Sequence, residues 1–404
     1  MSTSPQTIWL AEVATSGHRR VWLAAFADAL IQLGHQVVVL VPDPEPVRAT
    51  LPSETLEGGN ITFKQWDLPE LPQRNRAYLS NLSTMLRRWR SLAREVKVAP
   101  EKPDLVILPF LDVFVSHGLM PQLLDRIFPF AWYGIYFQPQ WTRINTAKHL
   151  KRPTCLFDTV AVQSKHCRGI GILDEGVATL VADKHQRAVD CFPDFIYPPI
   201  QAHASKLGAE VRERARSRTV VSFLGTIQSR KGFESFLKLL DAADSERHYF
   251  LIVGKFTPNR FPAEVLKRWA ELKTNSPENV WIYNGAIEDD QDYYDLFRQS
   301  DVIWGAYENW PHSSNGLTLA AALKKPILVN EGYLMAERVR AFDLGVVLPR
   351  DCSANTLTAA LGEIDADRSS QSAESFRQSQ ALAQLKLVLS SVLDRIKKQG
   401  DSHK

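Results

Sequence analysis

The sequence predicts an α/β protein of two domains, each a parallel sheet covered by helices on both faces. Three observations favour this class. The chain has 404 residues, more than one typical core holds. Short apolar runs alternate with amphipathic stretches, most regularly after residue 219. A proline-rich segment separates the two halves. The composition, 45% hydrophobic and 23% charged, is ordinary for a water-soluble globular chain.

The first half opens with a strand, a glycine loop, a helix and a second strand. Residues 8–13 are an apolar run, residues 14–18 a loop, residues 21–33 a helical pattern that Gly34 ends, and residues 37–41 a second run. Such a β-α-β unit begins a Rossmann-like sheet. Further strands are predicted at 105–108, 130–137, 158–163 and 177–181.

Candidate acceptor-side residues follow two of these strands. Ligands approach such sheets at the carboxyl ends of the strands, so Gly17 and His18 are predicted to face a bound acceptor. A surface or helix-capping histidine is the alternative. Tyr136 and Gln138 lie in the aromatic stretch 133–141. Aromatic and amide side chains there suit stacking on a sugar ring or an apolar acceptor, and ordinary packing is the alternative.

Residues 74–97 are predicted to form a basic amphipathic helix. An apolar stripe that includes Trp89 runs along it, and arginines crowd the other faces, with Glu95 the single acid. Such a helix can lie on an anionic bilayer. The alternative is that the stripe packs on the sheet and the cations are solvated.

The segment 191–200 contains three prolines and predicts a domain boundary. We therefore expect a first domain at 1–195, a linker at 196–218 and a second domain at 219–374. A final helix, 375–398, is long enough to return to the first domain. The second domain is predicted to alternate strands at 220–224, 249–253, 280–283, 301–306, 326–329 and 346–348 with helices at 232–243, 263–273, 290–299, 314–324, 334–342 and 354–363.

The stretch from Thr219 to Leu240 carries the clearest chemistry. A buried strand ends at Gly225 and Thr226, the loop brings Arg230 and Lys231, and a helix follows. Backbone N–H groups and the helix dipole would point at an anion there, and the two cations would add full charges. An ordinary strand-loop-helix turn with solvated cations is the alternative.

Several function classes are disfavoured. A formal charge of +3 is too small to argue for nucleic acid, and four scattered cysteines fit neither a disulfide framework nor a zinc site. The D-x-D patterns at 290–292 and 365–367 are read as solvated, so no metal is expected. The N-terminus lacks a signal-peptide pattern, and no run of 18 apolar residues exists, so a cytoplasmic protein is expected, with a peripheral place at the inner face of the membrane if helix 74–97 binds lipid.

Taken together, these features resemble those of GT-B fold nucleotide-sugar glycosyltransferases, and more closely the large retaining, family-four-like group (glycosyltransferase group 1) that includes sucrose synthases and lipopolysaccharide glucosyltransferases. The resemblance covers nearly the whole chain. Its marks are Gly17-His18, residues 33–37, residues 161–164, Gly225 through Gly232, residues 284–287, Ser300-Asp301-Val302 and residues 316–327.

The resemblance implies roles for individual residues. Arg230 and Lys231 would neutralise the leaving diphosphate as the catalytic cations. The nucleotide sugar would be held by donor-binding residues, namely Gly225, Thr226, Gly285, Ala286, Ser313, Ser314, Asn315 and Gly316. Apart from the resemblance, Glu308 and His312, in the loop before the helix at 314–324, and Glu331, just after the strand at 326–329, are candidates for the donor cleft by their positions in the chain. No metal or other cofactor is implied, and the acceptor would be a glycan, a lipid-linked cell-envelope acceptor or a small molecule.

The chain departs from the family pattern at two glutamates eight residues apart, which are Ser313 and Ala321 here. In the family the first orients the donor sugar and the second holds the ribose hydroxyls, and Ala321 can hold no hydroxyl. Three readings therefore stand: an active retaining transferase, another nucleotide-sugar enzyme on the same fold, and an inactive binding subunit. The sequence names neither the nucleotide, the sugar nor the acceptor.

Overall fold

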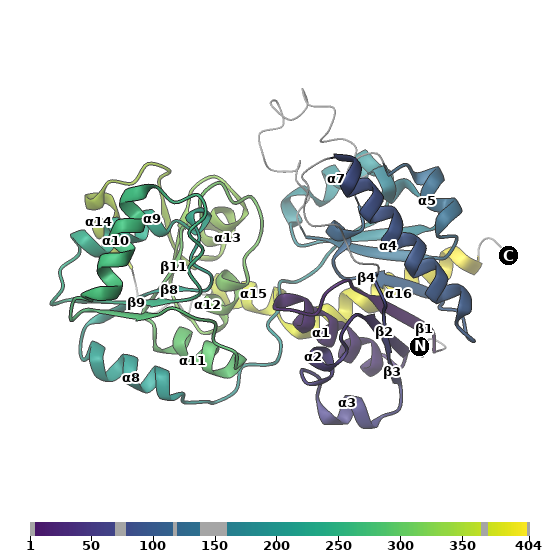
Figure 1. Ribbon diagram of the computed structural model, residues 1–404, viewed down its shortest axis with the longest axis horizontal. Helices are drawn as coiled ribbons and strands as arrows, with labels where there is room; N and C mark the ends of the chain where they lie inside the picture. The colour runs from purple at the N-terminus through teal and green to yellow at the C-terminus, as the bar shows by residue number, and fades with distance from the viewer. Residues whose placement is uncertain (1–4, 69–77, 116–118, 138–159, 365–370, 402–404) are drawn as a thin grey trace. The chain divides into compact units, whose positions relative to one another are not determined.

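The computed structural model describes residues 5–68, 78–115, 119–137, 160–364 and 371–401. The chain divides into two compact units. The first contains Met1–Pro193 and Leu382–Lys404, and the second contains Asp194–Ala381. Each unit is an α/β layer structure with helices on both faces of a parallel sheet (Figure 1). The predicted fold class is confirmed.

The first unit is built on a seven-stranded sheet of order β3-β2-β1-β4-β5-β6-β7. All of its strand pairs are parallel, as the β-α alternation requires. Its strands are β1 (Thr7–Ala11), β2 (Gln36–Val41), β3 (Ile61–Gln65), β4 (Leu105–Leu108), β5 (Trp132–Tyr136), β6 (Cys167–Ile172) and β7 (Val189–Cys191). Its helices are α1 (His18–Gln32), α2 (Glu45–Arg48), α3 (Ser53–Glu57), α4 (Tyr78–Val98), α5 (Pro121–Ile127), α7 (Ala178–His185) and α16 (Leu382–Asp401), with 3-10 turns η1 (Leu111–Val113), η3 (Val160–Gln163) and η4 (Glu175–Val177).

Two predicted strands of the first half are wrong. Residues 160–163 form η3, and residues 178–181 begin α7. Val177 and Val181 are buried while Leu180 is 46% exposed, so the short apolar run follows a helical period that its length hides. Strands β3, β6 and β7 were not predicted, because glycine and polar residues interrupt β6 and β7 is only three residues long.

Helix α4 packs its apolar stripe into the core of the first unit. Trp89, Leu92 and Val96 are fully buried, and the indole Nε1 of Trp89 donates a 2.8 Å hydrogen bond to the carbonyl oxygen of Phe114. The apolar stripe therefore packs inside the unit, which is the second of the two roles predicted for this helix. The cations Arg87, Arg90, Arg94 and Lys97 stay on the exposed side of the helix.

The second unit is built on a six-stranded parallel sheet of order β10-β9-β8-β11-β12-β13. Its strands are β8 (Thr219–Leu224), β9 (His248–Val253), β10 (Val280–Tyr283), β11 (Val302–Gly305), β12 (Ile327–Asn330) and β13 (Gly345–Leu348). Its helices are α8 (Lys206–Ala215), α9 (Phe233–Ala242), α10 (Ala263–Thr274), α11 (Asp290–Gln299), α12 (Asn315–Ala322), α13 (Leu334–Phe342), α14 (Ala354–Gly362) and α15 (Gln371–Ser379), with the 3-10 turn η5 (Ser229–Lys231). The strands and helices predicted here are all present.

The segment predicted as a linker, 196–218, contains α8, which belongs to the second unit. The backbone N–H and the hydroxyl of Ser205 both donate to the Asp295 carboxylate of α11, at 2.8 and 2.7 Å. These bonds, together with burial of Val211 and Ala215, fix α8 on the sheet. The high charge of this segment, which predicted a linker, belongs to the exposed face of a surface helix.

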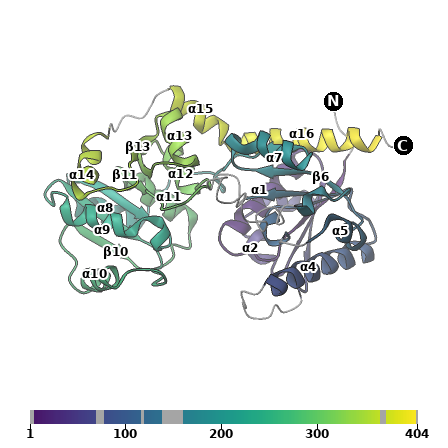
Figure 2. The ribbon, with the colours of Figure 1, turned by 90° about the horizontal axis from the view of Figure 1, so that it is seen from above.

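The predicted final helix is two helices, α15 and α16, which belong to different units. Helix α16 lies along the first unit (Figure 2). Arg395 holds it there through two 2.6 Å hydrogen bonds to the Asp190 carboxylate, which also accepts one of 2.9 Å from the Tyr133 hydroxyl. The return of the C-terminal helix to the first domain is thus observed.

Candidate functional site

In each sheet the strand order reverses at one point, and parallel α/β sheets bind ligands beyond the strand ends at that point. The reversal lies between β8 and β11 in the second unit and between β1 and β4 in the first. The connections that leave these strands run in opposite directions, which leaves room for a ligand between them. Most of the candidate residues predicted from sequence lie at these strand ends.

The loop after β8 is shaped by glycine. Gly232 has a φ of 70°, and a Cβ there would lie 2.1 Å from the carbonyl oxygen of Ala306, just after β11. Only glycine permits this close approach of the two loops. Gly225 has a φ of 104°, and a Cβ there would lie 2.9 Å from the Lys231 ammonium. The lysine therefore folds back over the end of β8.

The two predicted cations are supported by the loop that follows β11. The Arg230 guanidinium lies 4.5 Å from the ring centroid of Trp310, and the Lys231 Nζ lies 5.4 Å from that of Tyr307. The backbone N–H of Glu308 donates to the carbonyl oxygen of Arg230 at 2.8 Å. Burial lowers the pKa of Arg230 from its ordinary value. Both cations thus lie against aromatic rings at the edge of the sheet. Lys231 is half-buried and Arg230 is exposed.

Helix α12 follows β11 in the chain, and its first residues lie near these cations. Ser314 caps it by accepting a 3.3 Å hydrogen bond from the backbone N–H of Gly316, and its hydroxyl lies 3.4 Å from that of Tyr307. The same Tyr307 ring carries Lys231, so the helix start and the cationic loop share one aromatic side chain. The positive end of the helix dipole favours an anion here.

Ser313 has a different environment from that of its neighbours. Its hydroxyl donates to the Asp194 carboxylate at 2.7 Å and lies 2.7 Å from an Nη1 of Arg338. Arg338 is 2% exposed, and Asp194 is 5% exposed. Sequence reasoning missed both residues, because they lie 119 and 25 positions from Ser313 and belong to no recognisable motif. The hydroxyl predicted to bind the donor is already used in a buried polar cluster.

Three further candidates, Glu308, His312 and Glu331, lie in the loops after β11 and β12. Burial, with Glu234 nearby, raises the pKa of Glu308. The His312 ring packs edge-on against Trp310, at 5.0 Å between centroids. Glu331 instead points to the surface, where it pairs with Arg340 at 2.9 Å.

The predicted base-contacting turn follows β10. Gly285 lies against Tyr283, since a Cβ there would be 3.0 Å from the tyrosine ring. Ala286 is exposed, as is Thr226 in the loop after β8. Asn284 fixes the turn by accepting a 3.1 Å hydrogen bond from the backbone N–H of Phe256, in the loop after β9. The loops after β9 and β10 are therefore tied to each other.

In the first unit, the predicted acceptor-side residues are separated. Gly17 is the N-cap of α1 with a φ of 58°, and His18 is the exposed first residue of that helix. Tyr136 is 3% exposed and packs in the core. Gln138 lies outside the described residues. The half-exposed rings at this edge are instead Phe110 and Phe137, which stack with centroids 4.4 Å apart.

Sequence reasoning also missed Glu12, which follows β1 directly. Its side chain is fully buried and pairs with Arg19. Burial raises its pKa to about 7, although Arg19 and Arg88 lower it. A buried carboxyl at the reversal point of a sheet is a functional-site signal, and the sequence offered only a single acid in an apolar run.

Among the described residues, no cluster of three or more acidic, histidine or cysteine side chains could hold a metal ion. Asp289 caps α11, and Asp292 pairs with His203 at 2.6 Å. The second D-x-D pattern, 365–367, lies outside the described residues. No helix in the described part of the chain is long and apolar enough to cross a bilayer.

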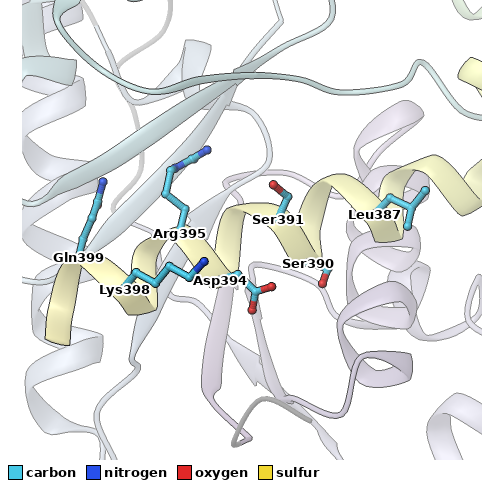
Figure 3. Close-up of a pocket in the computed structure, with 7 residues that line it drawn as sticks. All are labelled: Leu387, Ser390, Ser391, Asp394, Arg395, Lys398 and Gln399. Atoms are coloured by element: carbon cyan, nitrogen blue, oxygen red, sulfur yellow. The ribbon is translucent and has the colours of Figure 1, made fainter. Parts of the chain in front are cut away.

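Two cavities of the described part of the chain lie away from these strand ends. One is an open depression of about 710 Å³ along a face of α16, whose side chains Figure 3 shows. Its lining residues are Leu387, Ser390, Ser391, Asp394, Arg395, Lys398 and Gln399. Another, of about 410 Å³, lies by Cys167 at the amino end of β6. Neither lies at a carboxyl strand end, so the candidate site rests on the loops described above.

No family model and no curated protein matches the sequence. The structure is similar over both units to sucrose-phosphate synthase from Thermosynechococcus elongatus, with a TM-score of 0.65 at 15% identity, covering 98% of this chain and 100% of that one. It is also similar to HepE from Anabaena in complex with UDP and glucose, with a TM-score of 0.63 at 11% identity, covering 96% and 99% of the two chains. A UDP-N-acetylglucosamine 2-epimerase matches with a TM-score of 0.53 at 13% identity, covering 93% and 90%. With its two parallel-sheet units and these structural neighbours, the chain has the GT-B fold of nucleotide-sugar glycosyltransferases.

Proposed function

We propose that the protein transfers a sugar from a nucleoside-diphosphate sugar to a hydroxyl group of an acceptor, with retention of the anomeric configuration. One observation carries the proposal. Arg230 and Lys231 stand at the reversal point of the second sheet, on aromatic side chains of the loop that leads to α12. Two cations and a helix N-terminus are what a leaving diphosphate requires.

The chemistry follows from this arrangement. The acceptor oxygen forms a bond to the anomeric carbon on the face from which the diphosphate leaves. The bond from that carbon to the diphosphate oxygen breaks, and the hydroxyl proton passes to a phosphate oxygen of the leaving group. The protein supplies positive charge and positioning, so the reaction needs no metal and no side-chain base in the second unit.

The donor-binding roles are part of the proposal. Arg230 and Lys231 bind the diphosphate, aided by backbone N–H groups at Ser314 and Asn315, and the N–H of Gly316 joins them when it exchanges its 3.3 Å bond to the Ser314 hydroxyl for a phosphate oxygen. Gly225 and Thr226 line the same loop, and Gly285 and Ala286 lie where the base would be held. Structural neighbours crystallised with UDP support a nucleotide ligand of this class. An acceptor in the cell envelope remains one of the candidates.

A second candidate function has a specific observation in its favour. The Ser313 hydroxyl is already hydrogen-bonded to Asp194 and Arg338. Ala321 is 4% exposed and has no polar side-chain group. A chain that lacks both donor carboxylates suits an inactive nucleotide-sugar binding subunit. The epimerase neighbours support the remaining candidate, another nucleotide-sugar enzyme on this fold.

Calorimetric titration with UDP, GDP and ADP tests the proposal. We expect micromolar binding of one nucleotide, abolished in the Arg230→Ala/Lys231→Ala double variant. Lys238→Ala is the matched control, because this lysine lies on α9 and pairs with Glu234 at 2.9 Å. With the matching nucleotide sugar, Lys231→Ala should release nucleoside diphosphate at least about tenfold more slowly, since preorganised charge contributes a few kcal/mol to such barriers.

The outcomes separate the candidates. Failure of all three nucleotides to bind would contradict the proposal. Binding without release of nucleoside diphosphate from any sugar donor, with acceptors supplied, would favour the inactive binding subunit. Interconversion of free nucleotide sugars would favour the other enzyme class.

A further inference from the structure

We propose that Glu12, Arg88 and the stacked rings of Phe110 and Phe137 form a binding site for an uncharged, hydroxyl-bearing sugar ring in the first unit. This deepens the proposed transfer by naming its acceptor, and in that respect rests on it. The site lies at the carboxyl ends of β1 and β4, where the strand order of the first sheet reverses. It is the counterpart of the Arg230–Lys231 loop in the second unit.

Glu12 has one carboxylate oxygen satisfied and one not. Its Oε1 accepts hydrogen bonds from the Arg19 guanidinium and, at 2.8 Å, from the backbone N–H of Val13. Its Oε2 is buried and has no hydrogen-bond partner among the described residues. Leaving a buried carboxylate oxygen unpaired costs about 1–3 kcal/mol, so a ligand that supplies a donor is favoured.

Arg88 has a buried hydrogen-bond donor without an acceptor among the described residues. It extends from α4 and donates through Nη1 to the carbonyl oxygen of Val113. Its Nε is buried and has no acceptor within the described part of the chain. Glu12 and Arg88 are close enough to shift each other's pKa. A hydroxyl group is both donor and acceptor, so the hydroxyls of one sugar ring can satisfy Oε2 of Glu12 and Nε of Arg88.

The neighbouring aromatic rings suit the face of a sugar. Phe110 and Phe137 stack at 4.4 Å with an interplanar angle of 5°, and both are half-exposed. Trp22 supports Phe137 edge-on from α1, at 4.5 Å between centroids. The C–H groups of a pyranose pack on such surfaces while its hydroxyls seek polar partners at the edge.

The charges around Glu12 favour a neutral ligand. The charged groups that act on it are Arg19 from α1 and Arg88 from α4, and the Asp112 carboxylate of η1 accepts a 2.9 Å hydrogen bond from the backbone N–H of Phe137. Two acids thus balance two guanidinium groups. Arg19, 26% exposed and lying 5.1 Å from the Phe110 ring centroid, covers Glu12 from solvent and must turn aside to admit the ligand.

Ionisation of Glu12 adds a signature to the proposal. Burial raises the pKa of Glu12 to about 7. Only the carboxylate offers two acceptor oxygens, so sugar binding should strengthen as pH rises through about 7. A purely structural Glu12 would give no such dependence.

Saturation-transfer NMR with the methyl glycosides of glucose, galactose, mannose and N-acetylglucosamine tests the site. We expect transfer to at least one glycoside at pH 8, weakened at least fivefold at pH 6. In Glu12→Gln the amide oxygen can replace Oε1, but an NH₂ donor then faces Arg88. This variant should bind the glycoside at least fivefold more weakly at pH 8 and lose the pH dependence.

Two further variants keep the test decisive. Phe110→Leu removes a half-exposed ring without touching the charges and should weaken glycoside binding even if Glu12→Gln folds poorly. The Arg230→Ala/Lys231→Ala variant should keep glycoside binding while it loses nucleotide, which separates failure of this site from failure of the donor site. No saturation transfer to any glycoside, or equal transfer to wild type and to folded Glu12→Gln, would overturn the proposal.

Discussion

At the scale of single residues, burial decides which polar groups are chemically informative. Glu12 and Arg338 are both almost inaccessible to solvent, yet their surroundings differ. The Nη1 of Arg338 donates a hydrogen bond to the Ser313 hydroxyl, just before α12. The Oε2 of Glu12 has no hydrogen-bond partner among the described residues, and it lies at a strand end of the kind where parallel sheets bind ligands. The unpaired atom, more than burial alone, separates a candidate binding group from a structural one.

The raised pKa of Glu12 makes stability depend on pH. In the unfolded chain this carboxyl ionises near 4.5, and in the folded chain near 7. Between these values the folded state holds one more proton, so the free energy of unfolding falls as pH rises from about 4.5 to about 7. The shift corresponds to about 3 kcal/mol in total. Glu12→Gln should lack this contribution.

Urea unfolding of both proteins at pH 5, 6, 7 and 8 measures the effect. We expect the stability of Glu12→Gln relative to wild type to increase over this range by a few kcal/mol. Other titrating groups, such as His35, cancel in the difference. A difference that is flat with pH would show that Glu12 is not protonated in the folded protein near neutrality.

At the scale of elements, helices of similar composition have different roles. Helix α4 buries Trp89 and presents its other cations to solvent. Helix α16 also packs by an apolar face, which consists of Leu385, Leu389, Val392, Leu393 and Ile396. The Arg395–Asp190 ion pair adds a specific polar contact to this packing, while Leu387, 64% exposed, lies outside it.

Arg395→Met should weaken the packing of α16 on the first unit. The Asp190 side chain, which is 14% exposed, would lose its positively charged partner. The hydrogen bond from the Tyr133 hydroxyl would then be the remaining one of the three side-chain hydrogen bonds described above for this carboxylate. Because Arg395 is 28% exposed, we expect a cost below the about 3–5 kcal/mol that breaking a fully buried pair has. Faster amide hydrogen exchange in 382–401, with the second unit unchanged, is the expected result. Leu387→Ala is the matched control on the same helix and should leave exchange unchanged.

At the scale of the whole molecule, the same design occurs twice. Each unit has a parallel sheet with one order reversal, and each reversal carries charged side chains supported by aromatic rings. Donor chemistry is proposed for the second unit and acceptor chemistry for the first. The formal net charge of +3 gives no strong field over the molecule as a whole, so local clusters of charge decide its binding.

One such cluster lies on the exposed face of α4. Arg87, Arg90, Arg94 and Lys97 are the cations there, each worth about 1 kcal/mol near an anionic surface. We expect the protein to sediment with phosphatidylserine-containing vesicles at low salt and a triple variant, Arg87→Glu/Arg90→Glu/Arg94→Glu, to stay in solution. Phosphatidylcholine vesicles are the control. Equal sedimentation of both proteins would remove α4 as the membrane contact.

The sequence by itself determined the fold class, the order of elements in the second unit and the loop of Arg230 and Lys231. These features depend on local signals: apolar runs of strand length, helical periodicity, and glycine with cations at a strand end. It failed where the signal is not local. The residues around 177–181 have the apolar content of a strand but the burial period of a helix, and β6 and β7 are too short or too glycine-rich to recognise.

Only the tertiary structure decided which side chains share a site. Ser313 is hydrogen-bonded to Asp194 and Arg338, and Arg88 lowers the pKa of Glu12 electrostatically, across long intervals of sequence. Such partners meet because strands far apart in the chain end at the same edge of a sheet. Whether a polar atom there is paired depends on that packing, and no pattern of neighbouring residues encodes it.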